Sequence, residues 1–337
     1  MRITIRFLSL LLLFSLLFGL WGCDALPFGG GTQGGSQGGE DFTPPRYTEV
    51  VKTAFETSYA DQLSPNEKYI YDTIAALIPG VDSVDLTLPE EPALCRGRAP
   101  TEEEQNDLKD HLSAWTANAL YALWLDSPDM FWLDHTRYSY SMELASDDDG
   151  IVRLKKLTLS LTVTGTPEEI ASQKKLLEIA TLDFKPSRFD TVRQKVAYIN
   201  NYLCDRIEYD KNAPRRASVI GALVDGKCVC EGYARAFAYL AKIAGVDAVN
   251  IPGYATTDEG TEGHMWNGVL IDGVYYAVDA TWNDTTRESI YLLVGTNTVC
   301  HEKPFGKTHK PDMLTESDSH KAFAFPKIAE NAYLLKP

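Results

Sequence analysis

Positive charge is scarce in this sequence. Its 337 residues include 32 Lys and Arg against 47 Asp and Glu, which gives a formal net charge of −15 at pH 7. So acidic a surface argues against nucleic acid as a partner and against electrostatic docking on anionic lipid. Outside the N-terminal segment, no 18 apolar residues follow one another without interruption. We therefore expect no transmembrane helix in the rest of the chain.

Cysteine and histidine are also few, with six of each. No two cysteines have the Cys-x-x-Cys spacing, and Cys300, His301 and His309 match no recognised zinc spacing. We accordingly predict no metal site and no cofactor. Four cysteines could form disulfides in any of three pairings or could stay unpaired: Cys95, Cys204, Cys228 and Cys300.

The first 22 residues have the features of a signal peptide. Arg2 and Arg6 precede an apolar run from Phe7 to Leu20, which is too short for a comfortable membrane span. The next residues, Leu20-Trp21-Gly22-Cys23, resemble the bacterial lipobox, in which the cysteine is lipidated. We predict a lipid on Cys23 as the only membrane contact and an extracytoplasmic location at a bacterial membrane. The alternative is an ordinary signal peptide that is cut nearby.

A stretch rich in glycine, serine and glutamine follows at residues 27–39. Such sequences bury little apolar area and stay flexible, so we assign 23–45 to the lipid anchor and a linker. A boundary near Lys185-Pro186-Ser187 would divide the remainder into two parts. These are an N-terminal α+β region at 46–185 and a second domain, with a C-terminal extension, at 186–337.

Hydrophobic periodicity predicts both helices and strands in the folded part. The predicted helices cover residues 66–78, 102–125, 167–180, 190–206 and 231–244. The predicted strands cover residues 137–144, 151–163, 248–252, 265–271, 274–281 and 289–294. Thr101 and Glu104 form a capping box that starts the second helix. The hydrophobic periodicity of the last 40 residues is weak, and we predict no helix or strand there.

Three consecutive aspartates and a glycine, residues 147–150, separate two of the predicted strands. They resemble part of a calcium loop, but no downstream acidic pattern completes the ligand set. We interpret them as a solvated hairpin turn, with calcium binding as the alternative.

The strongest chemical signal lies around residue 230. After the turn at Asp225-Gly226 the sequence becomes rich in helix formers from Glu231 onward, so Cys230 lies at a helix N-terminus. Free N–H groups and the helix dipole stabilise negative charge there, which favours a nucleophilic thiolate. Cys228 lies in the entering loop and gains less from this effect.

A nucleophilic cysteine usually needs a base and a group that orients the base. Asp272-Gly273 between apolar runs predicts a two-residue hairpin turn. Counting outward from that turn places Trp266 opposite Asp279, with His264 two residues along on the same face. His264 and Asp279 would then be diagonal neighbours within side-chain reach. A bulge or a shifted turn would move Asp279 to the other face.

Three blocks resemble the bacterial transglutaminase-like superfamily. They are Cys-Glu-Gly-Tyr-Ala at 230–234, His-Met-Trp-Asn at 264–267 and Val-Asp-Ala-Thr-Trp-Asn-Asp at 278–284. The resemblance covers about residues 188–295. It implies an α+β, papain-like fold, with the cysteine on a helix start and His and Asp on an antiparallel sheet. Met265 and Cys228 depart from the pattern, because small residues and glycine are commoner at those positions.

The resemblance also implies acyl transfer at a Cys-His-Asp triad. Cys230 would attack a carboxamide or peptide carbonyl, and its own backbone N–H is a natural oxyanion donor. His264 would take the thiol proton and pass it to the leaving amine, while Asp279 would orient His264. Trp266 is a candidate for lining the acyl groove as a substrate-binding residue, and core packing is its alternative role.

These signals together predict an extracytoplasmic lipoprotein enzyme. It would be a cysteine peptidase or amidase, or a transglutaminase, acting on peptide or protein substrates through a thioester. Cell-wall peptide is among the candidate substrates, and water and an amine both fit the same triad as acyl acceptor. The alternative from another class is a catalytically silent binding or scaffold protein on the same fold.

Overall fold

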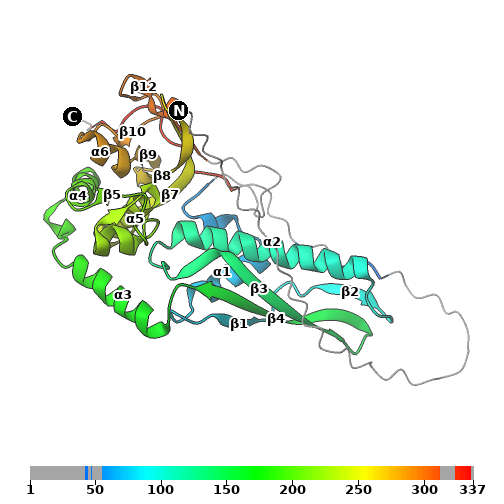
Figure 1. Cartoon of the computed structure of the whole chain (residues 1–337). Helices are drawn as coiled ribbons and strands as arrows, with labels where there is room; N and C mark the ends of the chain where they lie inside the picture. Colours follow the sequence, from blue (N-terminus) through cyan, green and yellow to red (C-terminus); the bar gives the residue numbers. More distant parts are fainter. Residues whose placement is uncertain (1–41, 45–46, 48–54, 312–322, 335–337) are drawn as a thin grey trace, which may run out of the picture. The chain divides into compact units, whose positions relative to one another are not determined.

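A computed structural model describes residues 42–44, 47, 55–311 and 323–334 (Figure 1). All described residues belong to one compact unit within Phe42–Pro337. The predicted signal peptide, the predicted lipidation site Cys23 and most of the predicted linker at 23–45 lie outside the described residues. Within the described part, no helix has the length and apolar character needed to cross a membrane.

The first part of this unit combines helices with a four-stranded antiparallel sheet. Its helices are η1 (Tyr59–Gln62), α1 (Pro65–Ala75) and α2 (Glu102–Asp126). Its strands are β1 (Ser83–Leu86), β2 (Ala93–Arg96), β3 (Leu133–Ser146) and β4 (Ile151–Val163). The long strand β4 pairs with each of the other three, so it organises the whole sheet.

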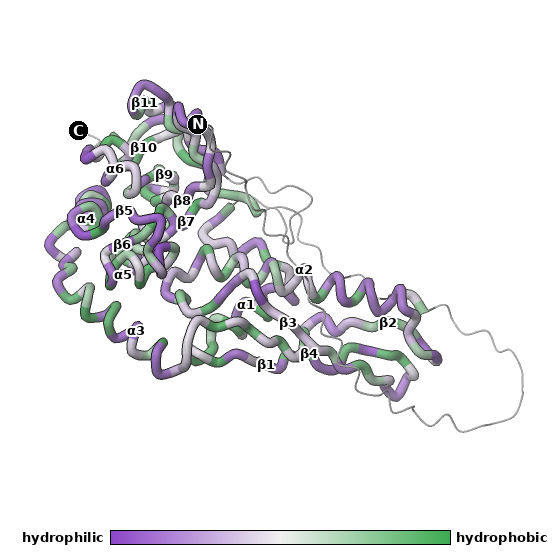
Figure 2. Tube along the Cα trace, in the orientation of Figure 1, coloured by the Kyte–Doolittle hydropathy of each residue, from purple (hydrophilic) through white to green (hydrophobic). Residues whose placement is uncertain are grey.

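Helix α2 lies along this sheet (Figure 1) and alternates hydrophobic and hydrophilic positions (Figure 2). Leu108, Leu112 and Trp115 are buried at the spacing that places them on one face of the helix. The predicted capping box is also present. Thr101 Oγ1 accepts from the Glu104 N–H at 3.2 Å, and the Glu104 carboxylate accepts from the Thr101 N–H at 2.8 Å.

The acidic turn between β3 and β4 is a hairpin turn, as predicted. Asp147 accepts hydrogen bonds from the N–H groups of Asp149 and Ile151 and pairs with Arg153 at 2.8 Å. Gly150 has a φ of 75° and so takes the left-handed conformation that closes the turn. The Asp147 carboxylate therefore has a structural role within the turn.

The second part begins after helix α3 (Pro167–Ala180) and packs helices against a second sheet. The helical segments are η2 (Pro186–Arg188), α4 (Val192–Cys204), η3 (Gly221–Asp225), α5 (Cys230–Ala244), α6 (Ala280–Thr286) and α7 (Phe305–Thr308). Two short strands, β5 (Glu208–Tyr209) and β6 (Lys227–Cys228), pair in parallel just before α5. The division at residues 185 and 186 stays a prediction.

The second sheet has five antiparallel strands in the order β10-β9-β8-β7-β13. They are β7 (Ala248–Thr257), β8 (Gly260–Ile271), β9 (Val274–Val278), β10 (Leu292–Val294) and β13 (His309–Pro311), and the pair β11 (Val299–Cys300) and β12 (Lys303–Pro304) precedes β13. Helix α5 packs on β7 and β8, and α4 packs on α5 (Figure 1). Val196, Phe237 and Val269 belong to the core between these layers.

Several predicted strand limits were wrong. The strand predicted at 274–281 ends at Val278, because Asp279 leaves the sheet to cap α6, which starts at Ala280. The strands predicted at 248–252 and 265–271 are longer and extend to Thr257 and back to Gly260. Their outer ends carry polar residues, which a hydrophobic period cannot detect.

Candidate active site

Cys230 is the first residue of α5, and its side chain is half-buried. The N-cap position, Val229, offers no side chain to the helix N–H groups. These N–H groups are therefore free to stabilise a charge or an oxyanion near Cys230. Cys228 differs, since it is fully buried in β6 and burial raises the pKa of its thiol well above the ordinary value. Its position favours a packing role for Cys228.

The predicted hairpin register is confirmed from the turn to Val278, whereas the predicted pairing of Trp266 with Asp279 is not formed. Asp272 and Gly273 have φ values of 51° and 80°, as a tight turn of the primed type requires. Pairing runs without a bulge from Ile271 opposite Val274 to Asn267 opposite Val278. The ladder ends there, and the next residue, Asp279, turns its side chain back toward β8.

His264 Nε2 lies 2.7 Å from Asp279 Oδ2, and both side chains are buried. Cys230 lies close enough to the same imidazole to contribute to its raised pKa, and Nδ1 is the ring nitrogen that Asp279 leaves open. The structure thus brings the three predicted residues together in the order thiol, imidazole, carboxylate. Their catalytic roles stay a prediction.

The surroundings of His264 favour its protonated form. Burial alone would lower its pKa, but the charge and the hydrogen bond of Asp279, together with the nearby Cys230, outweigh burial and raise the pKa to about 10. An imidazolium between a carboxylate and a thiol is the arrangement that stabilises a thiolate.

Asp279 is held by three hydrogen bonds. Oδ1 accepts from the backbone N–H of Trp282 at 3.0 Å, which caps α6. Oδ2 lies 2.7 Å from His264 Nε2 and 3.0 Å from Nε2 of a second histidine, His309. Burial would raise the pKa of Asp279, but the two imidazoles outweigh burial and hold it well below its ordinary range.

His309 is a residue that the sequence analysis missed. It starts β13, which pairs with β7 on the side opposite β8. His309 lies across from Ala255, while Gly253 of the same strand lies across from His264. No periodic signal predicts a strand at 309–311, so nothing in the local sequence could have brought this histidine into the site.

His264, Asp279 and His309 offer three possible metal ligand atoms within 4.8 Å of one another, a grouping found once in the described part of the chain. The two ring nitrogens are both at hydrogen-bond distance from one carboxylate oxygen. Hydrogen bonding accounts for this geometry, and we interpret the three residues as a hydrogen-bonded cluster. This cluster could not be predicted from the sequence, because His309 is close to Cys300 and His301 in the chain but far from His264 and Asp279.

Comparison with known families adds to this geometry. Residues 185–280 match the family model described as the transglutaminase-like superfamily. This segment is a transglutaminase-like domain. Cys230, His264 and Asp279 all lie within it, whereas His309 lies beyond its end. The fold combines 38% helix with 28% strand, and the predicted fold class is confirmed.

Two curated proteins resemble this chain. The kyphoscoliosis peptidase of Mus musculus is 28% identical over 181 residues, and that of Homo sapiens is 27% identical over 162 residues. The alignments cover 47% and 43% of this chain but only 27% and 24% of the relatives. The chain therefore spans about a quarter of the length of the curated relatives it matches.

Solved structures with a similar fold include a TGase and the periplasmic domain of TgpA from Pseudomonas aeruginosa bound to ethylmercury. The first has a TM-score of 0.30 at 16% identity and covers 42% of this chain and 44% of its own. The second has a TM-score of 0.28 at 16% identity and covers 45% and 67%.

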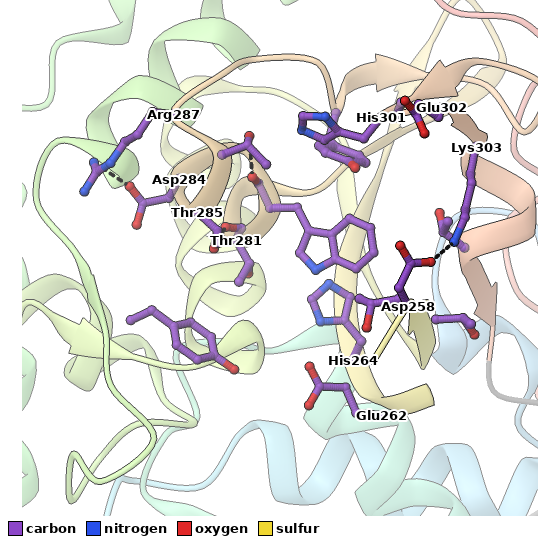
Figure 3. Close-up of a pocket in the computed structure, with 18 of the residues that line it drawn as sticks. Asp258, Glu262, His264, Thr281, Asp284, Thr285, Arg287, His301, Glu302 and Lys303 are labelled. Carbon is purple, nitrogen blue, oxygen red and sulfur yellow. Dashed lines mark hydrogen bonds and ion pairs between the residues drawn. The ribbon is translucent and has the colours of Figure 1, made fainter. Parts of the chain in front are cut away.

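A pocket of about 670 Å³ adjoins His264 in the transglutaminase-like domain (Figure 3). His264, Tyr209 and Trp282 contribute to its wall, whereas Cys230 itself does not line it. Burial, and next the nearby charge at Cys230, raise the pKa of Tyr209 to about 12, so its hydroxyl remains a hydrogen-bond donor. The pocket therefore lies next to His264 and not next to the Cys230 side chain.

The charged residues at the pocket rim largely neutralise one another. Asp258 pairs with Lys303, and Asp284 pairs with Arg287 at 2.9 Å (Figure 3). Polar wall contacts come from six threonines: Thr256, Thr257, Thr281, Thr285, Thr286 and Thr308. This lining suits a neutral, hydrogen-bonding ligand better than a strongly charged one.

Trp266 is 2% exposed and does not line the pocket. It packs with Ile251, Ala277 and Phe305 in a separate hydrophobic cluster. Its position therefore favours core packing, the second of the two predicted roles, over substrate binding. The tryptophan at the pocket wall is Trp282, which α6 presents.

The cysteines of the described chain form no disulfide. Cys95, Cys228 and Cys300 are buried as free thiols, and Cys204 is half-buried. None of the three possible pairings is therefore present within the described residues. Cys230 differs from the three buried thiols in its partial exposure and from all four in its closeness to the His264 imidazole.

Proposed function

We propose that this protein is a transglutaminase-like cysteine enzyme that forms a thioester between Cys230 and the acyl group of a peptide or carboxamide. One observation carries the proposal. The imidazole of His264 lies between a buried carboxylate at 2.7 Å and a half-buried thiol at a helix start. The carboxylate can orient the imidazole, and the imidazole can take the proton of the thiol, as acyl transfer requires.

In the first half of the reaction, the Cys230 sulfur attacks the carbonyl carbon and His264 holds the thiol proton. The oxyanion that forms lies near the free N–H groups at the start of α5. The carbon–nitrogen bond then breaks, and the leaving amine takes the proton from His264. A thioester on Cys230 remains.

In the second half, an acceptor attacks the thioester carbonyl and gives its proton to His264. The carbon–sulfur bond breaks and the thiolate returns. Water as acceptor gives hydrolysis, and an amine gives transamidation. We place hydrolysis first, because the curated relatives are named peptidases, and keep transamidation as the second candidate, because the matched family is transglutaminase-like.

We further propose that the enzyme is a lipoprotein that works outside the cytoplasm, with a lipid on Cys23 and protein or cell-wall peptide as substrate. The support is the lipobox-like segment ending at Cys23 and the glycine-rich residues after it. Metabolic labelling with an alkyne fatty acid should label the wild type and leave Cys23→Ser unlabelled. Equal labelling of both would contradict the anchor.

The test of the chemistry is alkylation of the full chain by iodoacetamide, with the modified cysteines identified by tandem mass spectrometry. We expect Cys230 to react fastest at neutral pH and His264→Ala to slow it by about tenfold or more. Cys228→Ala is the matched control and should leave the rate at Cys230 unchanged. Alkylation of Cys230 as slow as that of free cysteine would favour the silent scaffold protein instead.

A second assay separates the two acyl acceptors. Glutamine peptides would be incubated with and without a primary amine, while ammonia release, peptide cleavage and amine incorporation are followed. Cleavage or ammonia release without amine incorporation supports hydrolysis. Incorporation that competes with hydrolysis would establish transamidation instead.

A further inference from the structure

The oxygen of Asp279 that bonds His264 also bonds a second imidazole. Oδ2 is 2.7 Å from His264 Nε2 and 3.0 Å from His309 Nε2. The two rings are neighbours, with centroids 5.6 Å apart. A group that shares the oxygen used to orient the base is placed to influence that base directly.

His309 is held rigidly in this position. Its Nδ1 lies 2.9 Å from Thr308 Oγ1, and the Phe305 ring stacks on it at 4.0 Å with an angle of 12°. Strand β13 fixes the backbone through its pairing with β7. The imidazole is fully buried, so water cannot substitute for it at Asp279.

The surroundings keep His309 neutral. Burial outweighs the bonds to Asp279 and lowers its pKa, and the adjacent charge on His264 acts in the same direction. The rings that also face it come from Trp266, Trp282, Tyr291 and Phe305, and of these only Tyr291 can titrate. Burial raises the pKa of Tyr291, so it too is uncharged.

A neutral N–H donor suits the position of His309 beside the Asp279 carboxylate. It solvates a carboxylate that has lost all contact with water, without adding a positive charge that would compete with the His264 imidazolium. A lysine or a charged histidine there would weaken the interaction between Asp279 and His264.

We propose that His309 is a positioning residue that keeps Asp279 ionised and aimed at His264. The segment that ends in β13, beyond the residues matched by the family model, then completes the active site. This inference rests on the proposed function. It extends the triad to a fourth residue that bonds the carboxylate and makes no contact with substrate.

The test compares three variants of the full chain. His309→Phe keeps a ring but removes the donor, and His309→Gln keeps an N–H donor. Lys310→Ala, at an exposed neighbouring residue, is the control. Two readouts are taken. One is kcat/KM on the peptide substrate found above. The other is the pH at which alkylation of Cys230 reaches half its maximal rate, which a purely structural role would not move in a folded protein.

We expect His309→Phe to lower kcat/KM by about 10- to 100-fold, the worth of one hydrogen bond to a charged group, and to move the alkylation midpoint to higher pH. His309→Gln should restore the midpoint and come within about threefold of wild type, and Lys310→Ala should match wild type. A folded His309→Phe with the wild-type midpoint and rate would overturn the inference. A wild type without fast alkylation at Cys230 would instead overturn the proposed function.

A measurement on the wild type covers the case in which His309→Phe does not fold. Proton–nitrogen NMR of the imidazoles should show His309 neutral at pH 7 with its proton on Nε2, and its signals should be assigned by their loss in His309→Gln. A charged His309, or one protonated on Nδ1 alone, would overturn the inference.

Discussion

At the scale of a single residue, the two carboxylate oxygens of Asp279 have different hydrogen-bond partners. Oδ1 caps α6 through the N–H of Trp282, and Oδ2 bonds the imidazoles of His264 and His309. The cap turns the chain out of β9 at the point where the carboxylate must face β8. Capping and orienting are thus coupled in one side chain, and substitutions can separate them.

Asp279→Asn keeps an oxygen for the cap and loses the charge. We expect kcat/KM to fall by about 10² to 10⁴, because His264 loses the partner of its imidazolium. Asp279→Ala should lose as much activity and, in addition, about 1 kcal/mol of folding free energy from the missing cap. Steady-state kinetics and urea denaturation measure the two effects. Equal stability of the two variants would contradict the capping role.

The raised pKa of His264 also predicts how stability depends on pH. The pKa is about 10 in the folded protein against 6.5 for a free imidazole, so the folded state binds the proton more tightly. The resulting stabilisation is complete below about pH 6.5 and is lost as the pH rises to about 10. The lowered pKa of Asp279 acts in the opposite sense, and its contribution is lost only in acid, below 3.8.

Urea denaturation of wild type and His264→Gln at several pH values between 6 and 10 checks this. The difference in unfolding free energy should shrink steadily across that range. His111→Gln, at a partly exposed histidine on α2, serves as the control for removal of an imidazole outside the site. A wild-type advantage that does not change with pH would show that His264 is not charged in the folded protein.

At the scale of elements, the site depends on the close approach of β13 to β7. A Cβ added to Gly253 would lie 2.1 Å from the carbonyl oxygen of Lys310 and 2.8 Å from the Trp266 ring. Such contacts require the backbone of β13 to move. Because His309 is the first residue of β13, that movement would carry its imidazole away from Asp279.

Gly253→Ala should therefore reproduce the activity loss of His309→Phe and also lower stability by about 1 to 3 kcal/mol, as overpacking does. Gly263→Ala is the matched control. Gly263 lies next to His264 on β8, yet a Cβ there meets nothing within 4 Å, so this variant should stay close to wild type in kinetics and melting temperature. A Gly253→Ala variant that is as active as the control would contradict the dependence on β13.

At the scale of the whole described unit, the end of α2 is bound to the helix that carries Cys230. Arg235 donates to the Trp124 carbonyl at 2.8 Å, and the Trp124 indole donates to Glu231 at 3.0 Å. Arg235 is buried, and burial raises the pKa of Glu231, the residue after Cys230. The N-terminal region thus supports the first turns of α5.

Arg235→Met removes these donors and leaves buried carbonyls without partners. We expect a loss of about 2 to 4 kcal/mol in unfolding free energy, together with slower alkylation of Cys230 as the start of α5 loosens. Lys242→Ala, at the exposed end of the same helix, should change stability by less than about 0.5 kcal/mol. Chemical denaturation measures the unfolding free energy of Arg235→Met, and a loss below 1 kcal/mol would contradict the expected destabilisation.

The sequence by itself determined the features that depend on near neighbours. The capping box at Thr101, the turn at Asp272-Gly273 and the helix start at Cys230 each follow from a few consecutive residues, because backbone hydrogen bonds in caps and turns span three or four positions. The turn then set the hairpin register as far as Val278, and the next residue, Asp279, reaches His264 from the end of that ladder.

Only the tertiary structure decided the rest. His309 reaches Asp279, 30 residues away in the chain, through the pairing of β13 with β7 and of β7 with β8. Asp279 leaves its strand, and Trp266 packs in the core, because neighbours distant in sequence surround them. Contacts of this kind depend on which strands are neighbours in the sheet. The residue types near position 309 do not indicate that strand order.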